Sequence, residues 1–282
     1  MRKSIPVLLF SSIFLTAFLQ TKEVIFKSVF QPNKVYVTKM ESISKSEIDF
    51  TGPEDKIQQL KSSGLELPMI IEGSNAVTTV TQTFDLNPDG TFQAKIAYGN
   101  VQAYQVQNGK KTKSESPISG MLIEGIYDSE NKFKVNNLVS NKVDETVKKT
   151  LRYTLENAQE NINFPDRPLK IGDSFEQEIP MTIPVAGISN VEIIINTTYK
   201  LKDINGDMAK FDMNQSIKLN MNVKEVKMSA TGGGKGESIF DISEKLLTKY
   251  ESDLTIKLNM KVEDMVIDAK INAKSSQNIT VK

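Results

Sequence analysis

The sequence predicts a mainly β protein made of long, curved antiparallel sheets, with one central amphipathic helix and one short helix. Three observations support this fold class. Apolar and polar residues alternate strictly along several segments, those segments are unusually long, and Asn, Asp and Gly mark the turns between them. Such alternation is the main sequence signal for a strand with one buried face.

Residues 211–223 show the alternation most clearly. Their odd positions are apolar except for Gln215, and every even position is polar. A β-strand points successive side chains to opposite faces, so one face of this segment is apolar and the other is polar. Residues 92–98, 191–202 and 250–262 alternate in the same way. One polar face per strand is typical of antiparallel sheets, because buried parallel strands read as continuous apolar runs.

The length of these segments predicts curvature. Thirteen alternating residues span about 40 Å at roughly 3.3 Å each, about twice the usual strand. Strands of that length twist strongly, which favours curved, partly barrel-like sheets over a flat sandwich. The alternation changes phase at Glu263-Asp264, which predicts a β-bulge or a tight bend there.

Hairpin turns are predicted at residues 87–90, 128–131 and 205–207, where Asn, Asp and Gly accept the positive φ that tight turns need. Long hairpins at 75–106 and 190–224 stand at equivalent places in the two halves of the chain. The halves are therefore interpreted as two pseudo-repeats, an internal duplication.

Two segments predict helices. Residues 53–61 begin with Pro and two acids and end with Lys before Gly64, a short helix with favourable charges at both ends. Residues 142–161 carry one apolar residue per turn. We expect Leu151 and Leu155 of this stripe to be buried against a sheet, and Pro165 prevents the helix from continuing.

The predicted organisation is a signal peptide at 1–20, an N-terminal β half at 21–163 that includes the linking helix, and a C-terminal β half at 164–282, together forming one continuous unit. Arg2 and Lys3 precede an uncharged apolar run at 5–19, which fits a secretory signal and is short for a membrane span. The protein is expected in the periplasm or outside the cell. The alternative is an N-terminal membrane anchor, so any membrane attachment is expected only through this segment if it is not cleaved.

Composition excludes several functions. The 282 residues contain no His, Cys or Trp. Without His or Cys there is no Ser-His-Asp or Cys-His catalysis and no ordinary zinc, haem or iron-sulfur site. The 35 basic and 35 acidic residues balance, which disfavours a nucleic-acid partner. The sequence therefore predicts no catalytic residue, no metal site and no cofactor. The glycine-rich residues 231–238 do not fit a phosphate-binding loop and are interpreted as a flexible or bulged connection between strands.

Two motifs carry a family resemblance. Residues 164–175 read Phe-Pro-Asp-Arg-Pro-Leu-Lys-Ile-Gly-Asp-Ser-Phe, and glycine-rich residues 233–236 precede Phe240-Asp241. This combination resembles a domain-of-unknown-function family of exported, β-rich, uncharacterised proteins of Bacteroides-type bacteria, although Phe175 stands where many members have Trp. The resemblance covers most of the mature chain. It implies an exported β-rich protein and brings no catalytic residue with it.

The function predicted from the sequence is that of an exported, non-enzymatic envelope protein with a structural or partner-binding role. An alternative is a periplasmic binding or carrier module for an apolar or amphipathic ligand such as a lipid. A remote alternative is a hydrolase that depends on Asp and Glu alone. A carrier would need an open apolar groove, for which the candidate lining residues are Met213, Ile217, Leu219, Met221, Leu254, Leu258 and Met260.

The uncharged run at 5–19 leads to a first prediction. Signal peptidase cleaves after such a run, so the mature protein should begin between about residues 18 and 24. N-terminal sequencing of the protein from an envelope fraction checks this. A chain that still begins at Met1 would instead establish the membrane anchor.

Overall fold

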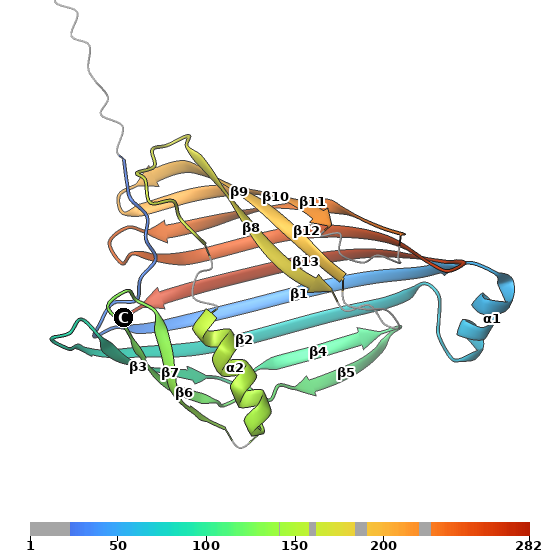
Figure 1. Ribbon diagram of the computed structural model, residues 1–282, viewed down its shortest axis with the longest axis horizontal. Helices are drawn as coiled ribbons and strands as arrows, with labels where there is room; N and C mark the ends of the chain where they lie inside the picture. Colours follow the sequence, from blue (N-terminus) through green and yellow to red (C-terminus); the bar gives the residue numbers. More distant parts are fainter. Residues whose placement is uncertain (1–22, 141, 158–161, 184–190, 220–226) are drawn as a thin grey trace, which may run out of the picture.

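A single antiparallel sheet of thirteen strands forms the body of the molecule, which confirms the predicted mainly β fold (Figure 1). This computed structural model describes residues 23–140, 142–157, 162–183, 191–219 and 227–282. The elements in chain order are β1 (Val35–Thr51), α1 (Glu54–Ser62), β2 (Met69–Leu86), β3 (Phe92–Tyr98), β4 (Gln102–Gln107), β5 (Lys110–Glu115), β6 (Leu122–Tyr127), β7 (Phe133–Val139), α2 (Glu145–Asn157), β8 (Ser174–Ile183), β9 (Val191–Asn205), β10 (Met208–Leu219), β11 (Lys227–Asp241), β12 (Leu246–Val262) and β13 (Met265–Val281). The predicted signal peptide lies outside the described residues.

The strand order joins both halves of the chain into one open sheet. It runs β7-β6-β3-β2-β1-β13-β12-β11-β10-β9-β8, with β4 paired to β2 and β5 paired to β4. β1 and β13 lie side by side in the middle, in register from Tyr36–Val281 to Thr51–Val266. The boundary predicted at 163/164 falls between α2 and β8, while the sheet itself is continuous across the two halves.

The three predicted hairpin turns are present, and the phase change at Glu263-Asp264 marks a fourth hairpin. Residues 87–90 join β2 to β3, residues 128–131 join β6 to β7, and residues 205–207 join β9 to β10. Of the two alternatives predicted at Glu263-Asp264, the structure shows the tight bend: these two residues form the turn between β12 and β13, where Val262 pairs with Met265 and Glu263 has φ 53°. The alternation changes phase because the chain reverses there and both strands keep their apolar residues on one face.

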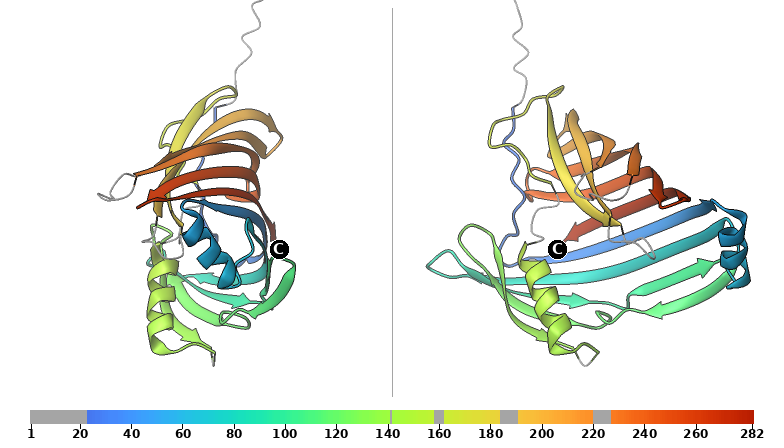
Figure 2. Two further views of the ribbon diagram at one scale, coloured as in Figure 1. Left: turned by 90° about the vertical axis from the view of Figure 1, so that its right-hand side faces the viewer. Right: turned by 45° about the vertical axis from the view of Figure 1, so that its right-hand side comes forward.

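Three buried clusters lie on the same face of the sheet, which we call the inner face. The first cluster lies under residues 23–34, an extended segment that we call the N-terminal strap. The third cluster lies under α2, where Leu151 and Leu155 are half-buried against it as expected. The strap, α2 and β8 all lie on this side of the sheet, and the opposite face is the outer face (Figure 2).

The second cluster is enclosed because the sheet rolls over itself. Ile193 and Ile195 of β9, Ile217 of β10 and Ile256 of β12 belong to this one cluster, although β11 lies between β10 and β12. The intervening β11 carries the glycine-rich segment, which is the interior of a strand and not the connection that we predicted. A Cβ on Gly236 would lie 2.4 Å from the Met213 side chain and 2.1 Å from a backbone oxygen, so this tight curvature requires glycine.

Both predicted helices are present, and both are short. α1 has 9 residues and begins just after Pro53, with acids in its first turn and Lys61 in its last. α2 has 13 residues, fewer than the 142–161 expected, and residues 158–161 lie outside the described residues. A membrane-spanning helix needs about 20 apolar residues. Within the described residues, no helix has the length and apolar character to cross a membrane.

The N-terminal strap ties two distant parts of the sheet together. Phe26 contacts three rings of the first cluster, with centroid distances of 5.4 Å to Phe164, 5.1 Å to Phe211 and 5.3 Å to Phe240. At the other end of the strap, the Phe30 amide donates to the Asn131 side chain at 2.8 Å, and that side chain donates back to the Phe30 carbonyl at 2.7 Å.

This packing predicts a large loss of stability for Phe26→Ala. The side chain is 3% exposed, whereas that of its neighbour Ile25 is 64% exposed. Truncating a buried Phe leaves a cavity and costs about 3–5 kcal/mol. Ile25→Ala should change the free energy of unfolding by less than about 0.5 kcal/mol. Denaturant melts of both variants check this, and equal effects would show that the strap is not docked in solution.

Candidate functional site

The predicted ligand-groove residues are distributed over two packed clusters. Met213 belongs to the first cluster, while Ile217, Leu254, Leu258 and Met260 belong to the second, and all five are at most 9% exposed. Leu219 packs half-buried against the second cluster, and Met221 lies outside the described residues. None of these residues lines either of the two hollows described below. The structure therefore places the six described residues in filled core.

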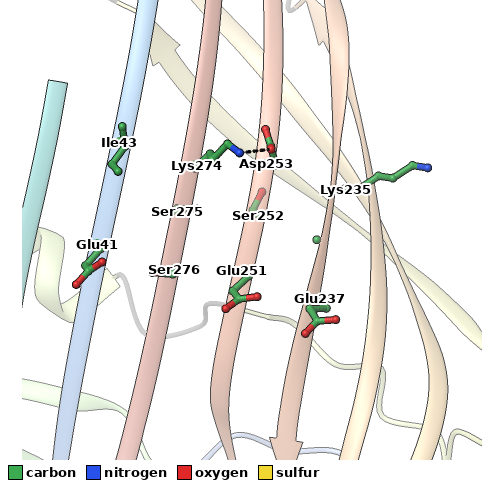
Figure 3. Close-up of a pocket in the computed structure, with 11 residues that line it drawn as sticks. Glu41, Ile43, Lys235, Glu237, Glu251, Ser252, Asp253, Lys274, Ser275 and Ser276 are labelled. Atoms are coloured by element: carbon green, nitrogen blue, oxygen red, sulfur yellow. Dashed lines mark ion pairs between the residues drawn. The ribbon is translucent and has the colours of Figure 1, made fainter. Parts of the chain in front are cut away.

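The larger hollow lies on the outer face, across β1, β13, β12 and β11, and has a volume of about 540 Å³ (Figure 3). Strand alternation points its charged lining away from the buried clusters. Its apolar residue is Ile43, which is 60% exposed. The outer-face residues that line it are Glu41, Ile43, Lys235, Glu237, Glu251, Asp253, Lys274 and Ser276.

Strand register brings these residues together in two rows. Glu41 lies opposite Ser276, which lies opposite Glu251, which lies opposite Glu237. The second row, two residues further along each strand, holds Ile43, Lys274, Asp253 and Lys235 in the same order of strands. The hollow thus presents an acidic row next to a mixed row.

Ion pairs occupy most of these charges. Lys210 pairs with Glu237 at 2.6 Å, and Lys249 pairs with Glu251 at 3.0 Å and with Glu237 at 3.4 Å. Lys274 pairs with Asp253 at 3.1 Å. The hydrogen bond from Lys210 is the main cause that lowers the pKa of Glu237, and the hydrogen bond to Glu251 is the main cause that raises the pKa of Lys249.

Two charges remain available to a partner. Within the described part of the chain, Glu41 and Lys235 make no ion pair, and they stand at opposite sides of the hollow. With the exposed Ile43 beside Glu41, the hollow offers one acidic, one basic and one apolar contact. Sequence reasoning missed this site. The charges alternate visibly along each strand, but only the long-range register shows that they meet.

The smaller hollow lies on the inner face, across β2, β1, β13 and β12, and has a volume of about 280 Å³. Its inner-face lining is neutral and consists of Met40, Ser42, Asn75, Tyr250, Ser275 and Gln277. Tyr250 is half-buried beside the first cluster, and burial raises the pKa of its hydroxyl. Both hollows touch Glu41, Ser275 and Ser276, so they back onto each other through β1 and β13.

Two observations on the acidic side chains bear on metal binding and acid catalysis. They contain no group of three or more Asp or Glu side chains placed to hold a metal ion. Where the pKa of a carboxyl group in this part of the chain is shifted, hydrogen bonds to the carboxylate lower it. A general acid for glycoside hydrolysis needs the opposite shift.

The ion pairs predict a pH-dependent contribution from Glu237. Because its folded-state pKa is lowered, it stabilises the fold above the ordinary Glu pKa of about 4.3, and this contribution is lost as the pH falls through the lower folded value. Glu237→Gln should therefore reduce the difference in unfolding free energy between pH 7 and pH 3, by about 1 kcal/mol or less. Denaturant melts at both pH values check this. Ser276→Ala removes an uncharged side chain from the same row and is the control; it should leave the difference unchanged, so equal effects of the two variants would contradict the assignment.

Comparisons with known proteins give distant structural similarity alone. The chain matches no protein-family model and no curated protein sequence. The translocator domain of the autotransporter NalP from Neisseria meningitidis is 6% identical over 87% of this chain and 88% of that one, with a TM-score of 0.33. The enduracididine biosynthesis enzyme MppR is 6% identical over 88% of each chain, with a TM-score of 0.11. At these TM-scores neither similarity assigns a fold or a function to this chain.

Proposed function

We propose that this chain is an exported, non-enzymatic envelope protein that binds a protein partner through the outer face of its sheet. The observation that carries the proposal is the hollow of about 540 Å³ on a face that neither described helix covers. An exposed apolar residue beside unpaired charges of both signs, Ile43 with Glu41 and Lys235, is a surface that a polar protein interface can complement.

The edge strands of the sheet are poorly suited to pairing with a partner, which favours binding of the partner on a face of the sheet. β5 carries Lys110, Lys111 and Lys113, and positive charges on an edge strand oppose pairing with another strand. β8 contains Pro180, which lacks a backbone donor. On the edge strand β7, the Val135 amide donates to the Glu156 carboxylate of α2 at 2.9 Å. This backbone donor is therefore not available to a further strand.

Packing favours a partner-binding role over the carriage of an apolar ligand. A carrier needs an open apolar cavity, and such sites usually measure about 300–1,000 Å³. The described candidates for its lining are core residues, and none of them lines either hollow.

Export and membership of the Bacteroides-type family are parts of this proposal. The uncharged run at 5–19 supports export, and the motif at 164–175 supports the family. Part of that motif lies in the core, since Leu169 is fully buried and Phe164 packs against Phe26. We expect membrane attachment only where the N-terminal segment is retained.

Site-specific photo-crosslinking in the cells that produce the protein tests the proposal. A photo-reactive phenylalanine analogue at Ile43 should give a discrete adduct with an envelope protein. The same analogue at Leu86, which is 58% exposed in the β2–β3 hairpin, should give none. The two positions match in exposure and apolar character and differ in their distance from the hollow.

A charge reversal completes the test. Glu237→Lys should abolish the Ile43 adduct, because it places a third Lys beside Lys210 and Lys249 and repels the surface that fits this hollow. Circular dichroism should show the variant folded. The proposal is refuted if Ile43 gives no adduct or if both positions give the same one.

A further inference from the structure

The inner hollow contains a row of small polar side chains that crosses three neighbouring strands. Ser275 of β13 lies opposite Ser42 of β1, which lies opposite Asn75 of β2. Alternation points all three to the inner face. The next row along the strands holds Tyr250, Gln277 and Met40 in register, which gives the hollow a longer wall on that side.

Most of these polar groups have unused hydrogen-bonding capacity. In the part of the chain that the structure describes, the side chains of Ser42, Asn75, Ser275 and Gln277 make no hydrogen bond. Polar side chains elsewhere on these strands bond to one another, for example Thr255 to Asn272 at 3.0 Å. Each carboxamide offers two donors and an acceptor oxygen, and each hydroxyl both donates and accepts. The hollow thus gathers free donors and acceptors in one place.

The inner lining carries no charge. Glu41 contributes to the rim, but alternation directs its side chain to the outer face. A charged ligand in this hollow would lose hydration without meeting a counter-charge, which is costly. Met40 and half-buried Tyr250 add apolar surface beside the polar row. A neutral ligand with both hydroxyl groups and C–H surface fits this combination.

We propose that the inner hollow binds a neutral carbohydrate of one or two sugar rings. Sugar hydroxyls donate and accept at once, so they match the amide groups of Asn75 and Gln277 and the hydroxyls of Ser42 and Ser275. The C–H surface of a ring contacts Met40. The hollow has a volume of about 280 Å³, just below the usual range for sites that bind drug-sized ligands. This volume limits the ligand to one or two rings.

An extended peptide is the main rival, and it fits less well. Peptides that bind a sheet add a strand at an edge, where backbone groups are free. β1, β13 and β12 are interior strands, paired on both sides, so their backbone groups are already used. The proposed site lies on the face opposite the protein-binding hollow and does not depend on that function.

Methionine-methyl NMR of the mature protein tests the proposal. The probes are the neutral disaccharides maltose, cellobiose and N,N′-diacetylchitobiose at about 10 mM each, enough to occupy most of a site with a Kd of about 1 mM. At least one of them should shift the Met40 methyl resonance in a saturable manner. The Met208 resonance should not shift, since Met208 is exposed at the β9–β10 turn, away from the hollow.

Neighbouring amides on opposite faces provide matched variants. Gln277→Ala removes an amide from the hollow and should weaken binding roughly tenfold, the loss expected for two hydrogen bonds. Asn278→Ala removes an exposed amide from the outer face of the same strand and should change the Kd less than about twofold. Raising the salt from about 0.05 to 0.5 M should leave the Kd unchanged, because the ligand is neutral.

Several outcomes would overturn the proposal. They are the absence of a Met40 shift with all three sugars, equal weakening by the two variants, and an affinity that falls as salt rises. A saturable Met40 shift with an uncharged Ser-Asn-Gln peptide, without a shift with the sugars, would assign the hollow to peptides instead. A failure here leaves the Ile43 crosslinking experiment intact, because the two hollows face opposite sides of the sheet.

Discussion

Hydrogen bonding between β1 and β13 joins residues that lie between 245 and 215 positions apart in the chain, from Tyr36–Val281 to Thr51–Val266. Each half of the sheet grows outward from this pair, mainly through hairpins between consecutive strands. Both hollows lie across it. Because a strand places neighbouring residues on opposite faces, a one-residue slip would exchange the two linings. Ser42 would then face outward and Ile43 inward. The register of this pair therefore fixes the position of both candidate sites.

Local sequence patterns predicted the elements well, because alternation and turn chemistry depend on a few adjacent residues. The strand over 208–219, the turn at 205–207 and the helix beginning at Glu54 follow from such patterns. Pairing between distant strands has no comparable local signal. Met213 and Leu254 were grouped as one groove because both lie on apolar strand faces, yet the roll of the sheet places them in different clusters. The phase change at Glu263 was detected, but a bulge and a hairpin produce the same pattern.

The glycine-rich segment shows how tertiary structure reverses a local interpretation. Gly232, Gly234 and Gly236 suggested a connection, since glycine is depleted in strands. In the structure they face inward on β11, where a Cβ on any of them would come within 2.4 Å of a backbone oxygen. Their absence of side chains lets β10 and β12 approach each other across β11, and both strands contribute to the second cluster. Ser252 also donates to Gln215 at 2.7 Å within this curve, a polar contact between the two clusters.

The residues of β1 are largely polar, which matters because its partner β13 lies at the far end of the chain. As the chain emerges in order, β1 pairs with β2 well before β13 is available, so one of its edges remains open. Open edges aggregate when they are flat and apolar. The outer face of β1 instead carries Lys39, Glu41, Lys45 and Glu47, and the middle of its inner face is serine-rich. These residues oppose aggregation of the open edge, and two of them, Glu41 and Ser42, line the hollows once β13 has paired. The need for a soluble central strand and the polar chemistry of the two sites therefore have the same physical origin.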